Sequence, residues 1–293
     1  MIMRYIGNKE SILDKIFSIL EANKIRGTSF FDFFAGTTNV SRFFKSKGYQ
    51  VFSSDILYLS YCLQKAYVEN NEDPAFPSLL PLLPDKGGCS LFTRPLDLVV
   101  DYLNSLPPVK GFIYQNYTPG GTKNLDRPRT YFIDDNGGRI DAIRMKIEEW
   151  KVAGLINESE YFILLACLIE TIGFYSNIAG VYAAFQKHWD PRALKPLELK
   201  TIEFVNNGLE NKVYCADSMD LIRNIDVDLL YLDPPYNERQ YAPNYHILET
   251  IAKYDSPSVR GVTGMRDYSD QKSRFCRAKT ALEDLDKVAR TAK

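Results

Sequence analysis

The sequence predicts an α/β fold in which a parallel sheet is interrupted by a long insert. Over residues 10–70, short apolar runs alternate with amphipathic stretches, which is typical of parallel strands joined by crossover helices. Residues 71–200 lose this alternation, and their first part is rich in Pro and Gly. Two later runs, at residues 212–217 and 227–233, restore the α/β pattern. The sheet is therefore expected to be discontinuous in the chain.

The first part of the chain is expected to begin this sheet. Residues 10–21 place their apolar side chains on one helical face and predict an amphipathic helix. The apolar run 29–34 predicts a buried strand, the segment Ala35-Gly36-Thr37-Thr38-Asn39 a tight turn, and the residues after it a second helix. Residues 49–55 predict a second strand, which a helical stretch follows to residue 70.

Residues 71–200 predict loops followed by helices. Residues 71–94 and 111–139 are expected to be loops, because Pro and Gly recur there, as in Asn136-Gly137-Gly138. Two helices are expected next, one marked by apolar residues from Ile140 to Trp150 and one by the apolar run from Tyr161. After Asp233 the pattern predicts one or two helices and no further strands.

Composition narrows the classes of function. The 36 Lys and Arg residues balance 37 Asp and Glu residues to a net charge of -1, which excludes a wholly basic nucleic-acid coat but not a local basic face. The 5 cysteines form no C-x-x-C pair and there are 2 histidines, so we expect no metal site. No apolar run approaches the ~20 residues of a membrane span, and none at the N-terminus suits a signal peptide. These features predict a cytoplasmic protein without a membrane partner.

The most specific motif is Asp233-Pro234-Pro235-Tyr236, which follows the last apolar run. It is expected at the carboxyl edge of the sheet, where open α/β sheets bind ligands. The two prolines hold the backbone rigid, so the Asp233 carboxylate and the Asp–Pro carbonyl form two acceptors that point the same way. The amino group of a nucleobase offers two matching donors, and Tyr236 can stack on the base. The alternative is an ordinary turn that ends the strand.

This motif and the residues after it resemble a known family. The further residues that carry the resemblance are Asn237-Glu238-Arg239-Gln240-Tyr241, Asn244-Tyr245-His246 and Glu249-Thr250. The sequence is similar to the Dam-like D12 class of N6-adenine DNA methyltransferases, and within it to the FokI-methyltransferase-like type IIS branch. The resemblance covers nearly all of the chain. It implies a Rossmann-like, S-adenosylmethionine-dependent methyltransferase sheet made of residues 1–70 and 201–293, interrupted by a largely helical target-recognition insert at residues 71–200.

A second motif concerns the expected turn after the first strand. A glycine at a strand-to-helix turn lets the backbone approach a ligand, although an ordinary tight turn is the alternative. The spacing differs from G-x-G-x-x-G, which disfavours NAD. The resemblance implies that the turn cradles S-adenosylmethionine. The candidate residues are Asp32, Phe34, Ala35, Gly36, Thr37 and Thr38.

Further cofactor candidates follow other elements. Asp55 ends the second predicted strand, about 20 residues beyond the glycine turn, where an acid holds ribose hydroxyls in such folds; a surface acid is the alternative. Asp217 and Ser218 follow the third strand and could simply cap a helix. The resemblance implies that Asp217 binds the adenine of the cofactor, and Asp233 is a further cofactor-binding candidate. It also implies that Tyr5 and Lys9 contact the methionine portion of the cofactor. The alternative, from the residues alone, is that they belong to a basic segment that precedes a helix.

Basic, amide and aromatic residues of the insert are candidates for DNA binding. Arg and Lys bind phosphates, while Arg, Asn and Gln can read base edges; for most single residues a solvated charged surface is the alternative. The candidates are Lys123, Arg127, Arg129, Asn177, Tyr182 and Lys187, with Arg239 outside the insert. Residues 177–189 resemble the family segment that borders the target-adenine pocket. His188 is expected to be structural or a phosphate donor.

The resemblance implies a site-specific methyltransferase that acts on double-stranded DNA. It would be the modification part of a restriction–modification system, with a cognate restriction endonuclease as its partner. It would transfer a methyl group to N6 of a flipped-out adenine, with Asp233, Pro234, Pro235 and Tyr236 as catalytic residues. The alternatives are an RNA adenine or DNA cytosine-N4 methyltransferase, or a non-catalytic DNA-binding subunit. The C-terminal strands of such a sheet are apparently missing. The chain is therefore expected to be truncated, or to be completed by a second chain or a homodimer, and to be unstable alone.

Overall fold

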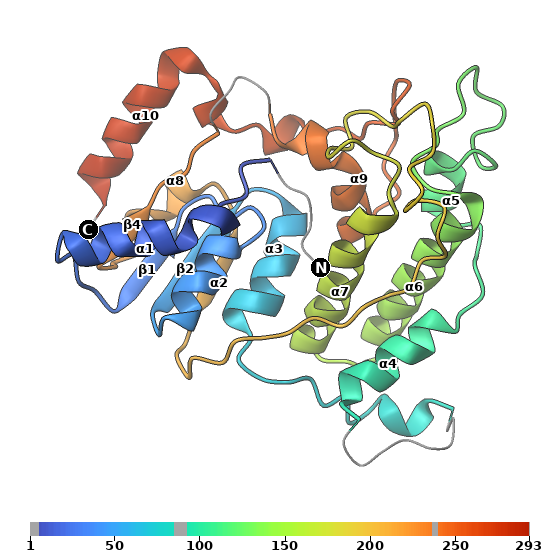
Figure 1. Ribbon diagram of the computed structural model, residues 1–293, viewed down its shortest axis with the longest axis horizontal. Coiled ribbons are helices and arrows are strands. Elements are labelled where there is room, and N and C mark those ends of the chain that lie inside the picture. The colour runs from blue at the N-terminus through green and yellow to red at the C-terminus, as the bar shows by residue number, and fades with distance from the viewer. Residues whose placement is uncertain (1–5, 85–92, 236–239, 293) are drawn as a thin grey trace. The chain divides into compact units, whose positions relative to one another are not determined.

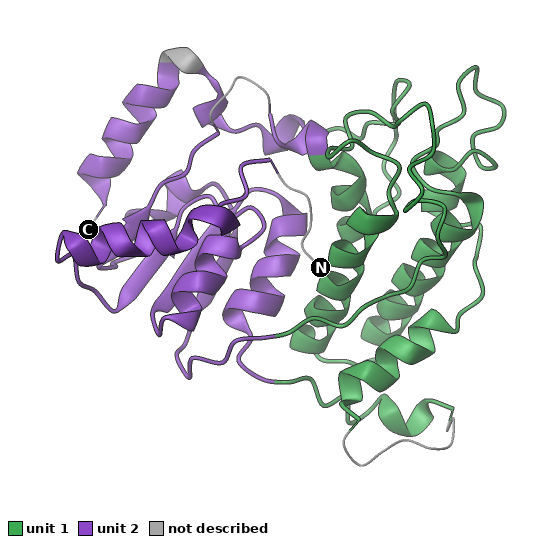
Figure 2. Cartoon of the chain, viewed as in Figure 1, with its two compact units in different colours: residues 1–4, 73–203, 245–267 green, residues 5–72, 204–244, 268–293 purple. Residues whose placement is uncertain are grey.

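The computed structural model of the chain describes residues 6–84, 93–235 and 240–292 (Figure 1). The backbone groups into two compact units. Unit 1 comprises residues 1–4, 73–203 and 245–267, and unit 2 comprises residues 5–72, 204–244 and 268–293 (Figure 2). Both units are therefore discontinuous in the chain, and residues 245–267, which the sequence assigned to the catalytic domain, group with unit 1.

Unit 2 contains a four-stranded sheet, and all of its strand pairs are parallel. The strands are β1 (Ser29–Asp32), β2 (Gln50–Asp55), β3 (Lys212–Cys215) and β4 (Leu229–Tyr231), in the spatial order β3-β2-β1-β4. Each strand overlaps one of the apolar runs that predicted it, so the parallel α/β fold class is confirmed. Because β1 lies between β2 and β4, the carboxyl ends of early and late strands meet at one edge.

Helices cover both faces of this sheet. They are α1 (Leu13–Ala22), α2 (Asn39–Ser46), α3 (Tyr58–Gln64), α8 (Ser218–Leu221) and α10 (Ala278–Thr291) (Figure 1). Alternate residues of a strand point to opposite faces. Phe30 accordingly packs with Phe44 of α2 and with the apolar side of α1, whereas Phe31 packs with Ile222 and with Val288 of α10.

Short helical turns complete unit 2. They are η1 (Glu10–Ile12), the π-helical turn η2 (Lys65–Glu69), η4 (Ser269–Gln271) and η5 (Arg274–Cys276). The turn η5 contributes Phe275 to the same apolar cluster as Phe31. The segment 269–276 is therefore part of the packed sheet unit.

Unit 1 is mainly helical. It contains η3 (Leu80–Leu82), α4 (Pro95–Asn104), α5 (Phe112–Tyr117), α6 (Asp134–Val152), α7 (Glu158–Tyr175) and the larger part of α9 (Ala242–Lys253). The helix α7 begins with a capping box, in which Asn157 and Glu160 each bind the backbone of the other. The two predicted helices of this region are present as α6 and α7.

The loop predicted for residues 111–139 is wrong at two places, because α5 lies within it and α6 begins at Asp134. Asp141 of α6 accepts hydrogen bonds from the backbone N–H groups of Ile113 and Tyr114 and thereby caps α5. Gly137 lies inside α6, where an added Cβ would come within 2.3 Å of the Thr118 side chain. This glycine allows close helix packing and does not break the helix.

Cys62, Cys167 and Cys276 are buried free thiols, and Cys215 is an exposed one. None of the helices in the described parts of the chain is long and apolar enough to cross a membrane. The same parts hold no group of three or more His, Cys, Asp or Glu side chains that could bind a metal ion.

Candidate active site

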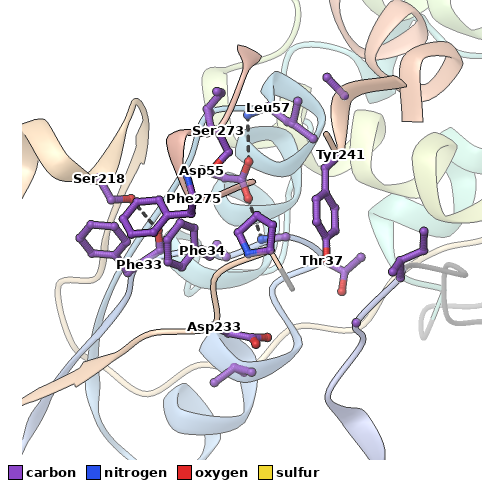
Figure 3. A pocket seen from close by; sticks show the side chains of 18 of the residues that line it. Phe33, Phe34, Thr37, Asp55, Leu57, Ser218, Asp233, Tyr241, Ser273 and Phe275 are labelled. Atoms are coloured by element: carbon purple, nitrogen blue, oxygen red, sulfur yellow. Dashed lines mark hydrogen bonds between the residues drawn. The ribbon is translucent and has the colours of Figure 1, made fainter. Parts of the chain in front are cut away.

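Unit 2 contains a cavity at the carboxyl edge of its sheet, with about 980 Å³ of space that includes space open to solvent (Figure 3). Its walls come from the turn after β1, the end of β2, the residues after β3 and β4, the segment 6–9 and residues 271–275. Crevices at this edge are where open α/β sheets bind nucleotide ligands.

The turn between β1 and α2 forms one wall. Four of the candidate cofactor residues of this segment, Phe34, Ala35, Gly36 and Thr37, line the cavity. Gly36 has a positive φ of 51°, a conformation that glycine adopts without steric cost. Its backbone N–H points to Asp55, with an N–O distance of 2.9 Å. The turn is thus tied to the neighbouring strand end.

Two predicted residues of this turn do not line the cavity. Asp32 is buried beneath it and accepts a hydrogen bond from the Ser41 hydroxyl at 2.6 Å. Burial raises the pKa of Asp32 to about 7; the Ser41 bond opposes this, and the charges of Asp233 and Asp55 add to it. Thr38 is also buried and is the N-cap residue of α2, in a left-handed conformation with φ of 66°. Both residues therefore support the turn from the protein interior and do not line the cavity.

Asp55 faces the cavity with a fixed carboxylate. Its Oδ2 accepts a hydrogen bond from Gly36 N and its Oδ1 accepts one from Leu57 N, each at 2.9 Å (Figure 3). A carboxylate offers about four lone-pair sites, so these two bonds orient the group without using its full acceptor capacity. Asp55 is therefore preorganised to accept hydrogen bonds from a ligand, as ribose hydroxyls would donate.

Asp217 and Ser218 line the cavity beyond β3. Asp217 caps α8 by accepting a hydrogen bond from Met219 N at 3.0 Å, which was the alternative role for this residue. The Ser218 hydroxyl donates to the carbonyl of Phe33 at 2.6 Å and fixes the wall beside the phenylalanine cluster (Figure 3). Capping and cavity lining are compatible, because the cap uses one carboxylate oxygen.

Asp233 follows β4 and lines the cavity together with Pro235. Its Oδ2 forms an ion pair with Lys9 Nζ at 2.7 Å. Burial raises the pKa of Asp233, and the hydrogen bond and charge of Lys9 oppose that rise. Among the predicted residues, Tyr5, Tyr236 and Arg239 lie outside the part of the chain that the structure describes.

Residues 271–275 form a further wall of the cavity that the sequence did not predict. Phe275 lines the cavity and packs edge-on against Phe34, with ring centroids 4.9 Å apart. The side-chain amide of Gln240 holds this segment, because Nε2 donates to Ser273 O at 3.0 Å and Oε1 accepts from Ser273 N at 2.7 Å. An isolated phenylalanine in a polar stretch was the one sequence signal for this wall.

The predicted DNA-binding residues in unit 1 divide into two groups. Lys123, Arg127 and Lys187 are exposed on loops. The other three are buried, with exposed fractions of 6% for Arg129, 0% for Asn177 and 2% for Tyr182. The exposed group stays a prediction for DNA contact.

The buried group binds the protein itself. The Arg129 guanidinium donates to the carbonyls of Asn116, Gly261 and Val262. The Asn177 amide donates to the carbonyls of Thr130 and Gln186, and the Tyr182 hydroxyl pairs with Ser176. Their polar groups are engaged within unit 1, so we replace their predicted DNA contacts with a structural role. Sequence alone did not reveal this, because loop residues of these types are usually exposed.

A cavity at the carboxyl edge of a parallel sheet, with a fixed acid at the end of β2 and an Asp-Pro-Pro turn after β4, is typical of α/β folds that bind nucleotide-like ligands. The family model of the D12 class N6 adenine-specific DNA methyltransferases matches residues 5–292. The chain belongs to this family, and the predicted family is confirmed. The family implies a methyl-donor cofactor and a DNA substrate.

Relatives at high identity agree with this family. The chain is 44% identical to the type II methyltransferase M.FokI of Planomicrobium okeanokoites, over 94% of the chain and 41% of the relative. It is 38% identical to the modification methylase StsI of Streptococcus sanguinis, over 97% of the chain and 42% of the relative. It is 39% identical to the type II methyltransferase M.NlaIII of Neisseria lactamica, over 99% of the chain and 80% of the relative. The chain thus spans about two fifths of the first two relatives. No solved structure matches it.

Proposed function

We propose that the chain transfers a methyl group from S-adenosylmethionine to N6 of adenine in double-stranded DNA, as the modification part of a restriction–modification system. The observation that carries this proposal is the position of Asp233-Pro234-Pro235 at the end of β4, where Asp233 and Pro235 line the same cavity as Asp55 and Asp217. The relatives named as modification methylases support the proposal. A cognate restriction endonuclease is its expected partner.

The residues of the cavity fit S-adenosylmethionine. Asp55 offers oriented acceptors for ribose hydroxyls, and Asp217 offers an acceptor for the amino group of the cofactor adenine. The rings of Phe33, Phe34 and Phe275 supply an apolar wall on the side of Ser218 (Figure 3). When bound, this cofactor supplies an electrophilic sulfonium methyl group.

The Asp233 turn would position the acceptor nitrogen. A base inside a duplex cannot reach the cavity, so adenine must be flipped out of the helix. The Asp233 carboxylate and the carbonyl beside Pro234 would accept hydrogen bonds from its amino group and hold the nitrogen in line with the methyl group. The benefit would be orientation and electrostatic stabilisation. Stacking of the base on Tyr236 stays a prediction.

DNA recognition would involve the insert, residues 71–200, most of which lies in unit 1. The exposed Lys123 and Arg127 lie on the loop between α5 and α6, and the exposed Lys187 lies on the loop after α7. The two loops are connected, because Asn177 binds the carbonyls of both Thr130 and Gln186. They would present cations to DNA phosphates as one surface.

The test is to incubate the protein with labelled S-adenosylmethionine and unmethylated DNA, with RNA in parallel, and to identify the labelled nucleoside. N6-methyladenine in DNA, lost in Asp233→Ala and retained in the exposed control Asp226→Ala, is the expected result. Label in RNA or in N4-methylcytosine would select a different substrate. Cofactor and DNA binding without any transfer would indicate a non-catalytic subunit.

A further inference from the structure

The ion pair between Lys9 and Asp233 lies inside the cavity. Both residues line it, and each side chain is 14% exposed. Lys9 Nζ lies 2.7 Å from Asp233 Oδ2 and donates a second hydrogen bond to the carbonyl of Gly7 at 2.8 Å. The ammonium is thus held directly against the carboxylate that is expected to bind the target amino group.

The segment that carries Lys9 is anchored on both sides. Asn8 Oδ1 accepts hydrogen bonds from Asn39 Nδ2 at 2.7 Å and from Glu10 N at 2.9 Å. Asn39 is the first residue of α2, so the segment is tied to the same helix that follows the cofactor turn. The position of Lys9 is therefore built into the fold of unit 2.

Three further titratable groups that interact with Asp233 are acids, and none of them is a cation. The carboxyl of Asp32 on β1 and the phenols of Tyr231 on β4 and Tyr241 interact electrostatically with Asp233, and Asp55 on β2 interacts with both Asp32 and Tyr241. Each of these groups is neutral or negative. Among the described residues that line the cavity, Lys9 is the one Lys or Arg side chain.

We propose that Lys9 is a positioning residue that keeps Asp233 ionised, so that this carboxylate can accept hydrogen bonds from the target amino group. The inference rests on the proposed function. A protonated carboxyl would present an O–H donor to the amino group and would lose acceptor capacity. A carboxylate has two oxygens, so an ammonium on Oδ2 is compatible with a substrate bond at Oδ1. The resemblance assigned Lys9 to the methionine portion of the cofactor instead.

The experiment compares Lys9→Met, Lys9→Arg and the control Lys15→Met in single-turnover methylation at saturating cofactor and DNA. Lys15 is an exposed lysine on α1. Near pH 7 we expect Lys9→Met to be about tenfold slower or more, and near pH 9 to recover towards the wild-type rate, because an adjacent cation lowers a carboxyl pKa. Lys9→Arg should keep the wild-type pH profile, and Lys15→Met should not differ from wild type.

A loss of rate that is equal at all pH values, or a change confined to cofactor affinity, would overturn the proposal. A second measurement does not depend on activity: the Asp233 carboxyl is labelled with ¹³C, assigned with Asp233→Asn, and titrated by NMR. The pKa of Asp233 should rise in Lys9→Met and should remain at its wild-type value in Lys9→Arg. An unchanged pKa in a folded Lys9→Met protein would also overturn the proposal. Lys9→Gln replaces Lys9→Met if the latter fails to fold. If the protein methylates nothing, the titration still decides the role of Lys9.

Discussion

The Asp55 carboxylate accepts a hydrogen bond from the backbone N–H of Gly36, with an Oδ2–N distance of 2.9 Å. This bond connects the end of β2 to the turn after β1. A second bond, from Leu57 N to Oδ1, fixes the same group from the opposite side. The acid and the glycine turn are therefore one structural unit, in which each fixes the position of the other.

Asp55→Ala should weaken cofactor binding by about 10- to 100-fold, because it removes both the acceptor and the anchor of the turn. Asp55→Asn should also bind poorly, since its NH₂ group would face one of the two backbone N–H donors. Isothermal titration with S-adenosylhomocysteine measures the affinity, with the exposed Asp226→Ala as the control. Wild-type affinity in Asp55→Ala would exclude this residue from the cofactor site.

Gln240→Ala should release the segment that carries Phe275. We expect cofactor affinity to fall about tenfold, because two hydrogen bonds to Ser273 are lost. Gln240→Glu should also weaken cofactor binding, since it keeps the acceptor for Ser273 N but places a carboxylate oxygen against Ser273 O. Hydrogen exchange of the Ser273 amide reports the release directly. The exposed Gln115→Ala is the control, and unchanged exchange in Gln240→Ala would contradict this prediction.

The sequence predicted those parts of the site that are local in the chain. The apolar runs located all four strands, and polar residues directly after a parallel strand must lie at one edge of the sheet. Asp55, Asp217 and Asp233 were found in this way. Their position depends on strand direction alone, which a hydrophobic pattern reveals.

The remaining features depend on contacts between distant residues. Gln240 and Ser273 are 33 residues apart, and no local sequence pattern at either residue predicts the hydrogen bonds between them. Arg129 was expected on the surface, but carbonyls of Gly261 and Val262 surround its guanidinium. Gly137 was expected in a loop, but it lies inside a helix, where the close approach of Thr118 requires a glycine. Packing of this kind is set by tertiary structure and not by periodicity.

Arg129→Met should destabilise the protein by about 3 kcal/mol, because three carbonyls that accept from a buried guanidinium would lose their donor. The exposed Arg127→Met should change stability by less than about 0.5 kcal/mol. Chemical unfolding of both variants gives the comparison. Equal stability of Arg129→Met and wild type would contradict a structural role for Arg129.

Alanine substitutions at Lys123, Arg127 and Lys187 should weaken DNA binding without altering the melting temperature. Each phosphate contact that is lost should lower the magnitude of the slope of log K against log salt by about 1, and the effect should be similar for specific and unrelated DNA. Fluorescence anisotropy at several salt concentrations measures the slope, with Lys15→Ala as the control. An unchanged slope in the triple variant would place the DNA contacts elsewhere.

Asp32 should make the protein less stable as the pH rises. Burial raises its pKa to about 7 in the folded state, against 3.8 for an unperturbed carboxyl. Between these two values the folded state retains a proton that the unfolded state has lost, so stability falls across this window, by at most about 4 kcal/mol. Asp32→Asn stays neutral and can still accept from Ser41. Its stability relative to wild type should therefore increase from pH 4 to pH 7 in urea unfolding, whereas the exposed Asp226→Asn should show no such trend. A difference between Asp32→Asn and wild type that stays constant across the window would mean that Asp32 is ionised in the folded protein.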